Sequence, residues 1–266
     1  MPVIPALKAL LDSVPHASGP IEDVPAFRAM GREGAKALAH AFAEPPLEVG
    51  RVTTVTIPVN EGEIALRIYQ PTEEGPHPIH LYYHGGGWIA GDIDDPFVDV
   101  ACRERTALAG CVTVAVDYRL APEHKFPVPL EDSYAALLWI VDHATEFDAD
   151  PERVTLGGGS AGGNLAAAVA LKARNENGPA IIFQLLEIPA LDLTAASPSV
   201  ETYGTGEYPL SKPELEQAIG FRHTLDIDAT AYRLVHGEGD LIPSLVVDRY
   251  GDYISLQALS QGTDRL

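Results

Sequence analysis

The chain has 266 residues, of which 46% are hydrophobic and 21% are charged, and its formal net charge is −20 at pH 7. This length and composition predict one large soluble domain, or a domain plus a fragment, with enough apolar residues for a core. The negative charge is spread along the chain, which disfavours nucleic acid and anionic membranes as partners. No apolar run reaches the length of a membrane span, and the first eleven residues lack the basic start of a secretory signal. We therefore expect a cytoplasmic protein.

The first predicted elements are two amphipathic helices, at residues 3–11 and 26–42, where apolar residues recur at helical spacing. Two alternating strands follow, at 51–59 and 63–69, joined by the hairpin signal Asn60-Glu61-Gly62. Further strands then alternate with helices. The strands are expected at 79–83, 111–116, 153–156 and 180–188, and the helices at 96–108, 130–143 and 165–174. This alternation predicts a mostly parallel, doubly wound α/β sheet that begins with an antiparallel hairpin.

The chain contains two cysteines. Cys102 lies in a predicted helix and Cys111 opens a predicted strand, so we expect buried free thiols rather than a disulfide or a metal site. No cofactor is expected.

A glycine-rich turn separates the predicted strand Arg153–Leu156 from the helix that follows it. The turn reads Gly158-x-Ser160-x-Gly162. Strand, tight turn and helix in this order hold a serine hydroxyl clear of the sheet at a helix N-terminus, and a Cβ on either side would clash. The N–H groups and dipole at that terminus favour developing negative charge. Ser160 is therefore the candidate nucleophile, and the alternative is a glycine-rich turn that serine merely caps.

A second glycine-rich loop, His84-Gly85-Gly86-Gly87-Trp88, follows the predicted strand 79–83. The carboxyl ends of parallel strands share one edge of a sheet, so this loop should lie beside Ser160. Its N–H groups and that of Ala161 could then hold an oxyanion. The other interpretation is a phosphate-binding loop, but no lysine or G-x-G-x-x-G pattern accompanies it. We expect His84 to be structural, fixing the loop rather than acting as general base.

These motifs resemble those of the hormone-sensitive-lipase-like (bacterial family IV) esterases, which have the α/β-hydrolase fold. The resemblance covers about residues 1–217 and rests on four motifs in the family's order: His84–Trp88, Asp117–His124 with Phe126-Pro127, Gly158–Asn164 and Pro189–Leu193. It implies Ser160 as nucleophile and the N–H groups of Gly85, Gly86 and Ala161 as oxyanion hole. It also implies a cap that includes the N-terminal helices. Gly159 departs from the family, which usually has an acidic residue or threonine before the nucleophile.

The last part of the chain departs further. An α/β-hydrolase needs an acid and then a histidine after the serine, and the family's stretches for both are absent here. Residues from about 220 to 266 resemble an internal piece of ribosomal-RNA cytosine-5 methyltransferases, which predicts a truncated esterase joined to a foreign fragment. The expected domains are therefore N-terminal cap helices (1–45), an incomplete hydrolase core (46–219) and a short β-rich fragment (220–266).

Only His223 and His236 follow Ser160 as histidines. His236 is the better candidate base, and Asp240 is a candidate acid because its surroundings resemble a strand end that bears the acid in many α/β-hydrolases. No histidine follows Asp240, so the family's order is not completed. The alternative is that both are ordinary polar residues at a strand end.

The sequence thus predicts a carboxylic ester hydrolase of short-chain esters acting through a Ser160 acyl-enzyme, impaired if no histidine reaches the serine. The alternative is an inactive, oligomerising remnant of an esterase. The expected partner is a small-molecule ester, with neither nucleic acid nor membrane. We also expect a homo-oligomer, formed through an open edge of the sheet or by exchange of tails, and expect strand 232–236 to pair with that edge.

Overall fold

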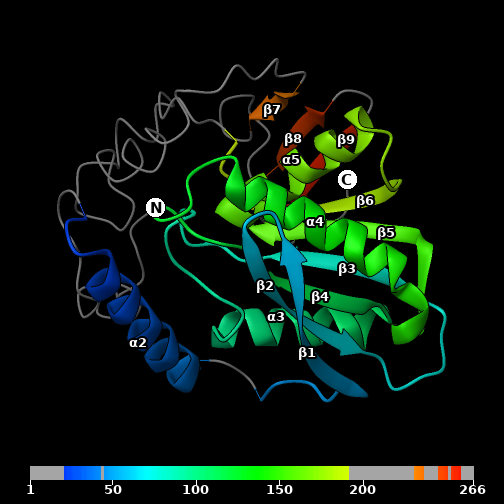
Figure 1. The fold of residues 1–266 in the computed structure, drawn as a ribbon, viewed down its shortest axis with the longest axis horizontal. Helices are drawn as coiled ribbons and strands as arrows, with labels where there is room; N and C mark the ends of the chain where they lie inside the picture. The colour runs from blue at the N-terminus through cyan, green and yellow to red at the C-terminus, as the bar shows by residue number, and fades with distance from the viewer. Residues whose placement is uncertain (1–20, 43–44, 192–230, 237–244, 251–252, 259–266) are drawn as a thin grey trace.

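The computed structural model describes residues 21–42, 45–191, 231–236, 245–250 and 253–258 (Figure 1). These residues form a six-stranded sheet with helices on both faces and a separate sheet of three strands. The helices are α2 (Val24–Phe42), α3 (Pro96–Ala109), α4 (Val128–Asp142), the short 3₁₀ helix η1 (Ala144–Phe147) and α5 (Ala161–Asn175). The strands are β1 (Arg51–Val59), β2 (Gly62–Gln70), β3 (His77–Tyr83), β4 (Val112–Asp117), β5 (Ala149–Gly159), β6 (Ile181–Glu187), β7 (Ala231–His236), β8 (Leu245–Tyr250) and β9 (Tyr253–Ala258).

The strand order of the large sheet is β1-β2-β4-β3-β5-β6. Strands β1 and β2 form an antiparallel hairpin, and β2 also pairs antiparallel with β4. The strands β4, β3, β5 and β6 run parallel to one another. This confirms the predicted doubly wound sheet with an antiparallel start. From β3 the chain continues to β4 on one side and later to β5 on the other. The carboxyl end of β3 is therefore a topological switch point, where such sheets bind ligands.

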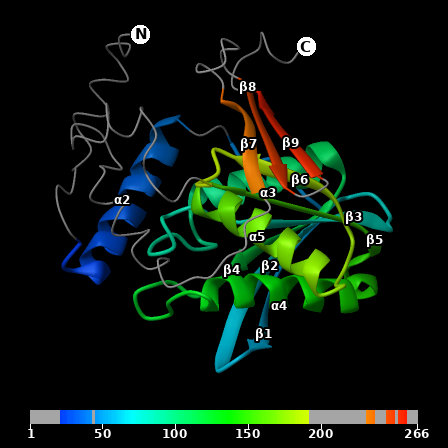
Figure 2. The ribbon, with the colours of Figure 1, turned by 90° about the horizontal axis from the view of Figure 1, so that it is seen from above.

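Two apolar layers cover the sheet, because successive side chains of a strand point to opposite faces. On β3, Leu81 and Tyr83 belong to the larger core cluster with residues of α4 and α5, whereas Tyr82 packs with residues of α3 on the other face. Figures 1 and 2 show α4 and α5 on one side of the sheet and α3 on the other. The helix α2 stands apart from the sheet at the side of the molecule. The helix predicted at 3–11 lies outside the described residues.

Helix α3 begins and ends at residues that are typical of helix ends. Asp95 is its N-cap, and the Oδ1 atom accepts a hydrogen bond from the Phe97 N–H at 2.8 Å. Pro96 fills the first helical position, where no N–H partner is needed. Gly110 ends the helix in the left-handed conformation, with φ of +62°.

Strand β5 is longer than predicted at both ends. Ala149 and Asp150 already pair with β3, and the register shifts before the pairing resumes at Val154. At the other end Gly157–Gly159 remain in the strand, paired with β3 or β6. The glycines therefore belong to the last, tightly packed residues of the strand, and the turn itself is Ser160.

The three strands near the C-terminus form their own antiparallel sheet, in the order β7-β8-β9. The strand expected at 232–236 is present as β7, and β8 and β9 pair antiparallel. The expected pairing of strand 232–236 with the open edge of the large sheet is wrong, since β7 pairs with β8 and not with β6. Sequence-adjacent strands close only short loops when they pair, which favours the local arrangement.

Both cysteines are free and buried, as expected. Burial raises the pKa of the Cys102 thiol and of the Cys111 thiol. Within the described ranges, no helix is both long and apolar enough to span a bilayer.

Candidate functional site

Ser160 occupies the turn between β5 and α5 in a backbone conformation that side chains rarely adopt, with φ of +54° and ψ of −115°. Neighbouring backbone holds it there. Its N–H donates to the Glu187 carbonyl at 2.9 Å, and its own carbonyl accepts from the N–H groups of Asn164 at 3.1 Å and Ala190 at 3.2 Å. The Ser160 hydroxyl does not cap the helix. The hydroxyl is therefore not engaged in the hydrogen bond that a capping serine would make.

The glycines around Ser160 are required by close packing. A Cβ at Gly158 would overlap the Tyr83 carbonyl oxygen and come within 2.6 Å of the Gly162 carbonyl carbon. At Gly162 a Cβ would overlap the Tyr83 carbonyl oxygen and lie 2.5 Å from that of His84. The end of β3 and the start of α5 thus touch backbone to backbone, as the motif predicts.

The glycine loop after β3 lies against Ser160. A Cβ at Gly85 would sit 3.6 Å from the Ser160 Cβ and 3.1 Å from the Gly159 carbonyl oxygen, so the two motifs lie side by side. Among the described residues, the N–H groups of Gly85 and Gly86 donate to no backbone carbonyl. Ala161 is the first residue of α5, where a helix leaves its N–H groups without helical partners. Free N–H groups thus come from both loops.

His84 is buried and occupied in holding this loop. Its Nδ1–H donates to the Gly85 carbonyl at 2.8 Å, and its ring stacks on Tyr118 with the centroids 4.2 Å apart. The Tyr118 hydroxyl in turn donates to the His84 carbonyl at 2.7 Å. Burial lowers the pKa of the His84 imidazole, which is therefore neutral near pH 7. These contacts agree with the structural role expected from the sequence.

Among the described residues, no histidine is hydrogen-bonded to the Ser160 hydroxyl. The buried His80 uses its Nδ1 on the Thr155 hydroxyl, and burial lowers its pKa to about 3. His223 and Asp240 lie outside the described residues. His236 ends β7, of which the backbone is described. The structure therefore does not place either candidate base or the candidate acid against Ser160.

A buried ion pair fixes the loop after β4, and the sequence analysis missed it. Arg119 binds Asp132 of α4 through two hydrogen bonds, Nε to Oδ2 at 2.8 Å and Nη2 to Oδ1 at 2.7 Å. The same guanidinium donates to the carbonyls of Asn60 and Glu61 in the β1–β2 turn. Arg119 therefore ties the hairpin, the β4 loop and α4 together. The only sequence signal for it is its place within the motif Asp117–His124.

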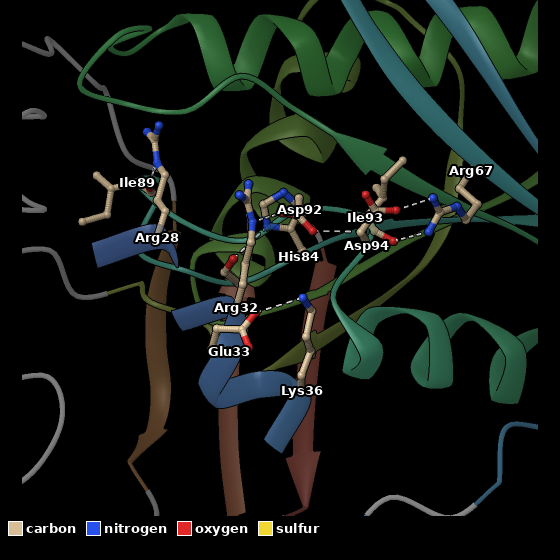
Figure 3. A network of polar contacts seen from close by, with 11 residues as sticks. Arg28, Arg32, Glu33, Lys36, Arg67, His84, Ile89, Asp92, Ile93 and Asp94 are labelled. Carbon is tan, nitrogen blue, oxygen red and sulfur yellow. Dashed lines mark hydrogen bonds and ion pairs between the residues drawn. The ribbon is translucent and has the colours of Figure 1, made fainter. Parts of the chain in front are cut away.

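The helix α2 contacts the segment that follows the glycine loop, a connection the sequence analysis also missed (Figure 3). Arg28 donates from Nε to the Ile89 carbonyl at 2.6 Å, and Arg32 pairs with Asp92 at 2.8 Å. The two arginines are one helical turn apart and so share a face of α2. That spacing is a signal in the sequence for a polar face on α2, but it does not identify the segment that this face contacts.

Asp117, at the end of β4, has a pKa raised to about 6, first by burial and then by the nearby carboxylate of Asp92. Because the folded protein holds this proton more tightly than the unfolded chain, stability falls as pH rises from about 4 to about 6. Asp117→Asn should flatten that fall and raise the free energy of unfolding at pH 7 by on the order of 2 kcal/mol. Urea titrations of both proteins at pH 4.5 and pH 7 measure it. An equal pH slope in the two proteins would contradict the assignment.

A family model described as alpha/beta hydrolase fold matches residues 80–257 of the chain. The chain belongs to the α/β-hydrolase family. Among α/β-hydrolases, it is 34% identical to the esterase LipI of Mycobacterium tuberculosis, over 94% of this chain and 81% of LipI. It is 42% identical to the carboxylic ester hydrolase LipN of the same organism, over 73% of this chain. Among solved structures, a hyperthermophilic esterase from the archaeon Pyrobaculum calidifontis aligns with a TM-score of 0.73 at 35% identity, covering 83% of this chain and 69% of that one.

The chain spans about half the length of LipN, 51%. The match to the α/β-hydrolase family runs to residue 257, beyond the junction expected near residue 220. These similarities support the resemblance to family IV esterases in fold. The methyltransferase-like origin of residues 220–266, and with it the truncation, stays a prediction.

Proposed function

We propose that this α/β-hydrolase is a carboxylic ester hydrolase that acts on short-chain esters through an acyl-enzyme at Ser160. The observation that carries the proposal is the pairing of two loops. The strained Ser160 turn exposes a hydroxyl at the start of α5, and the Gly85–Gly87 loop lies against it with free N–H groups. Relatives and solved neighbours named as esterases support the same activity.

In this mechanism the Ser160 Oγ attacks the ester carbonyl carbon while a base takes its proton. The oxyanion that forms accepts hydrogen bonds from the N–H groups of Gly85, Gly86 and Ala161. The protonated base gives its proton to the alcohol as the C–O bond breaks. Water then attacks the acyl-enzyme by the same route and restores the serine. We propose His236 as base, with His223 as the alternative, and Asp240 as the acid that orients it.

The test combines a covalent label with a burst assay on the full chain. A p-nitrophenyl phosphonate should label Ser160 alone, and p-nitrophenyl butyrate should give a burst that Ser160→Ala lacks, with turnover lower by at least ~10³-fold. Ser133 is the internal control, because its buried hydroxyl donates to the Pro129 carbonyl at 2.7 Å. A label on Ser133 or Ser211 would overturn the site. No label and no burst would favour the inactive remnant.

The base is tested in the same assay. His236→Ala should lose turnover nearly as completely as Ser160→Ala, whereas His223→Ala should keep it. Full turnover in His236→Ala removes that residue from the mechanism, and loss in His223→Ala would put the alternative base in its place.

Self-association also stays a prediction. It is supported by the edge position of β6 and by the exposure of its apolar side chains, with Ile182 58% and Phe183 59% accessible. Light scattering from the purified chain measures it, and a monomer at all concentrations would dismiss it.

A further inference from the structure

The segment that carries the proposed oxyanion hole has an unusual backbone. Gly86 and Gly87 have φ of +119° and +63°, and Trp88 also has a positive φ, of +63°. A tight turn follows, in which the Gly86 carbonyl accepts hydrogen bonds from the N–H groups of Ile89 at 3.2 Å and Ala90 at 2.9 Å. Backbone in such conformations persists only where surrounding groups hold it. The direction of the glycine N–H groups therefore depends on what holds this turn.

Arg28 of α2 holds the turn from outside. Its Nε donates to the Ile89 carbonyl at 2.6 Å and its Nη2 to the Ala121 carbonyl at 2.8 Å. The N–H of the same Ala121 donates to the Trp88 carbonyl at 2.9 Å. The guanidinium and the Ala121 peptide thus bind two consecutive carbonyls of the loop. Figure 3 shows Arg28 reaching from α2 to Ile89.

Glu123 fixes the guanidinium itself. Its carboxylate accepts from Arg28 Nη1 at 3.0 Å and Nη2 at 2.8 Å, and this hydrogen bonding lowers the pKa of Glu123. The Arg28 side chain is 19% exposed and that of Glu123 is 50% exposed, so the two carbonyl contacts of Arg28 are better shielded from water than its contact with Glu123. A planar guanidinium can serve the carboxylate and two carbonyls together, which a lysine ammonium cannot match in geometry.

We propose that Arg28 is a positioning residue: from the cap helix it holds the 85–90 loop in the conformation whose N–H groups receive the oxyanion. The cap and the oxyanion hole are thereby one hydrogen-bonded unit, and docking of α2 sets the catalytic loop. The inference rests on the proposed ester hydrolysis for its catalytic meaning. The hold on the loop itself can be tested without turnover.

The experiment compares Arg28→Ala and Arg28→Lys with Lys36→Gln in the full chain. Lys36 is the matched control, because it lies on the same helix, is 62% exposed and pairs with Glu33 within α2. In Arg28→Ala, amide hydrogen exchange in residues 85–92 should be about tenfold faster or more, with exchange in β3 and β5 unchanged. Phosphonate labelling of Ser160 should slow by about 10–100-fold, and kcat should fall in step while KM stays within about twofold. For each of these measurements, Arg28→Lys should give a value between that of Arg28→Ala and that of the unmodified chain.

Unchanged exchange in residues 85–92 of Arg28→Ala overturns the proposal, and so does faster exchange with an unchanged labelling rate. If the unmodified chain is not labelled at all, the esterase proposal fails, and the exchange result alone decides whether Arg28 holds the loop. If kcat fell equally in Lys36→Gln, Arg28 would only stabilise α2 in general. That result would contradict its role in positioning the 85–90 loop.

Discussion

Replacing Asp132 by alanine should lower the free energy of unfolding by about 3–5 kcal/mol, because it leaves the guanidinium of Arg119 without its counter-charge inside the protein. The Asp132 side chain is 1% exposed and that of Arg119 is 15% exposed, so water cannot replace the carboxylate. The Arg119 N–H, 3.1 Å from Asp132 Oδ2, loses its acceptor as well. Hydrogen bonding to Asp132 raises the pKa of Arg119 in the unmodified protein. The arginine stays charged in the variant as well, because the ordinary pKa of a guanidinium lies far above neutral pH.

Urea unfolding followed by tryptophan fluorescence measures this loss. Glu33→Gln is the control, since the Glu33–Lys36 pair lies on the surface of α2 and its removal should change stability by less than about 1 kcal/mol. Asp132→Asn keeps acceptor and shape and should fall between the two. A loss below about 1 kcal/mol in Asp132→Ala would mean that the pair contributes no more than a surface contact.

Gly162→Ala should destabilise the fold by at least about 3 kcal/mol, or prevent folding, because the new Cβ meets carbonyl groups that cannot rotate away. The obstacles are the carbonyls of Tyr83 and His84 at the end of β3. Relief would require α5 to move off the sheet, and with it the Ser160 turn. Thermal unfolding by circular dichroism, together with the yield of folded protein, measures the effect.

The control makes the same substitution in another helix. Gly31 of α2 has no atom within 4 Å of an added Cβ, so Gly31→Ala should raise stability by about 0.5–1 kcal/mol. If Gly162→Ala lowers stability while Gly31→Ala raises it, the loss at Gly162 is due to packing and not to the glycine-to-alanine change itself. If both variants were stabilised, the backbone contact between β3 and α5 would not be as close as described.

The sequence predicts the fold well where its patterns are local. The alternation that predicts the strand at 51–59 is realised over the same residues in β1. Of the Asn60-Glu61-Gly62 signal, the first two residues form the turn and Gly62 begins β2, paired with Val59. The placement of the two glycine loops also follows from sequence, since a parallel sheet puts the ends of β3 and β5 at one edge. Local periodicity and general topology suffice for these features.

Features that depend on distant partners were not predictable. Arg28 meets Ile89 across 61 positions of sequence and Arg119 meets Asn60 across 59, and nothing in the pattern around either arginine names its partner. The pairing of β7 was mispredicted for a related reason, because an open edge offers hydrogen bonds but a neighbouring strand reaches them with less loss of chain entropy. Contacts between residues so far apart in sequence, such as those of Arg28 and Arg119, are seen only in the folded structure.

The close approach at Gly158 and Gly162 has a consequence for how such sequences change over time. Selection on folding alone preserves these glycines, because a Cβ at either position meets backbone whether or not Ser160 attacks a substrate. A lineage that loses its base would therefore retain Gly158 and Gly162 for as long as it keeps the sheet, whereas the Ser160 hydroxyl, which does not cap α5, is under no such packing constraint. The two glycines therefore indicate how β3 packs against α5. Whether a chain is active depends on the serine and on the groups that reach its hydroxyl.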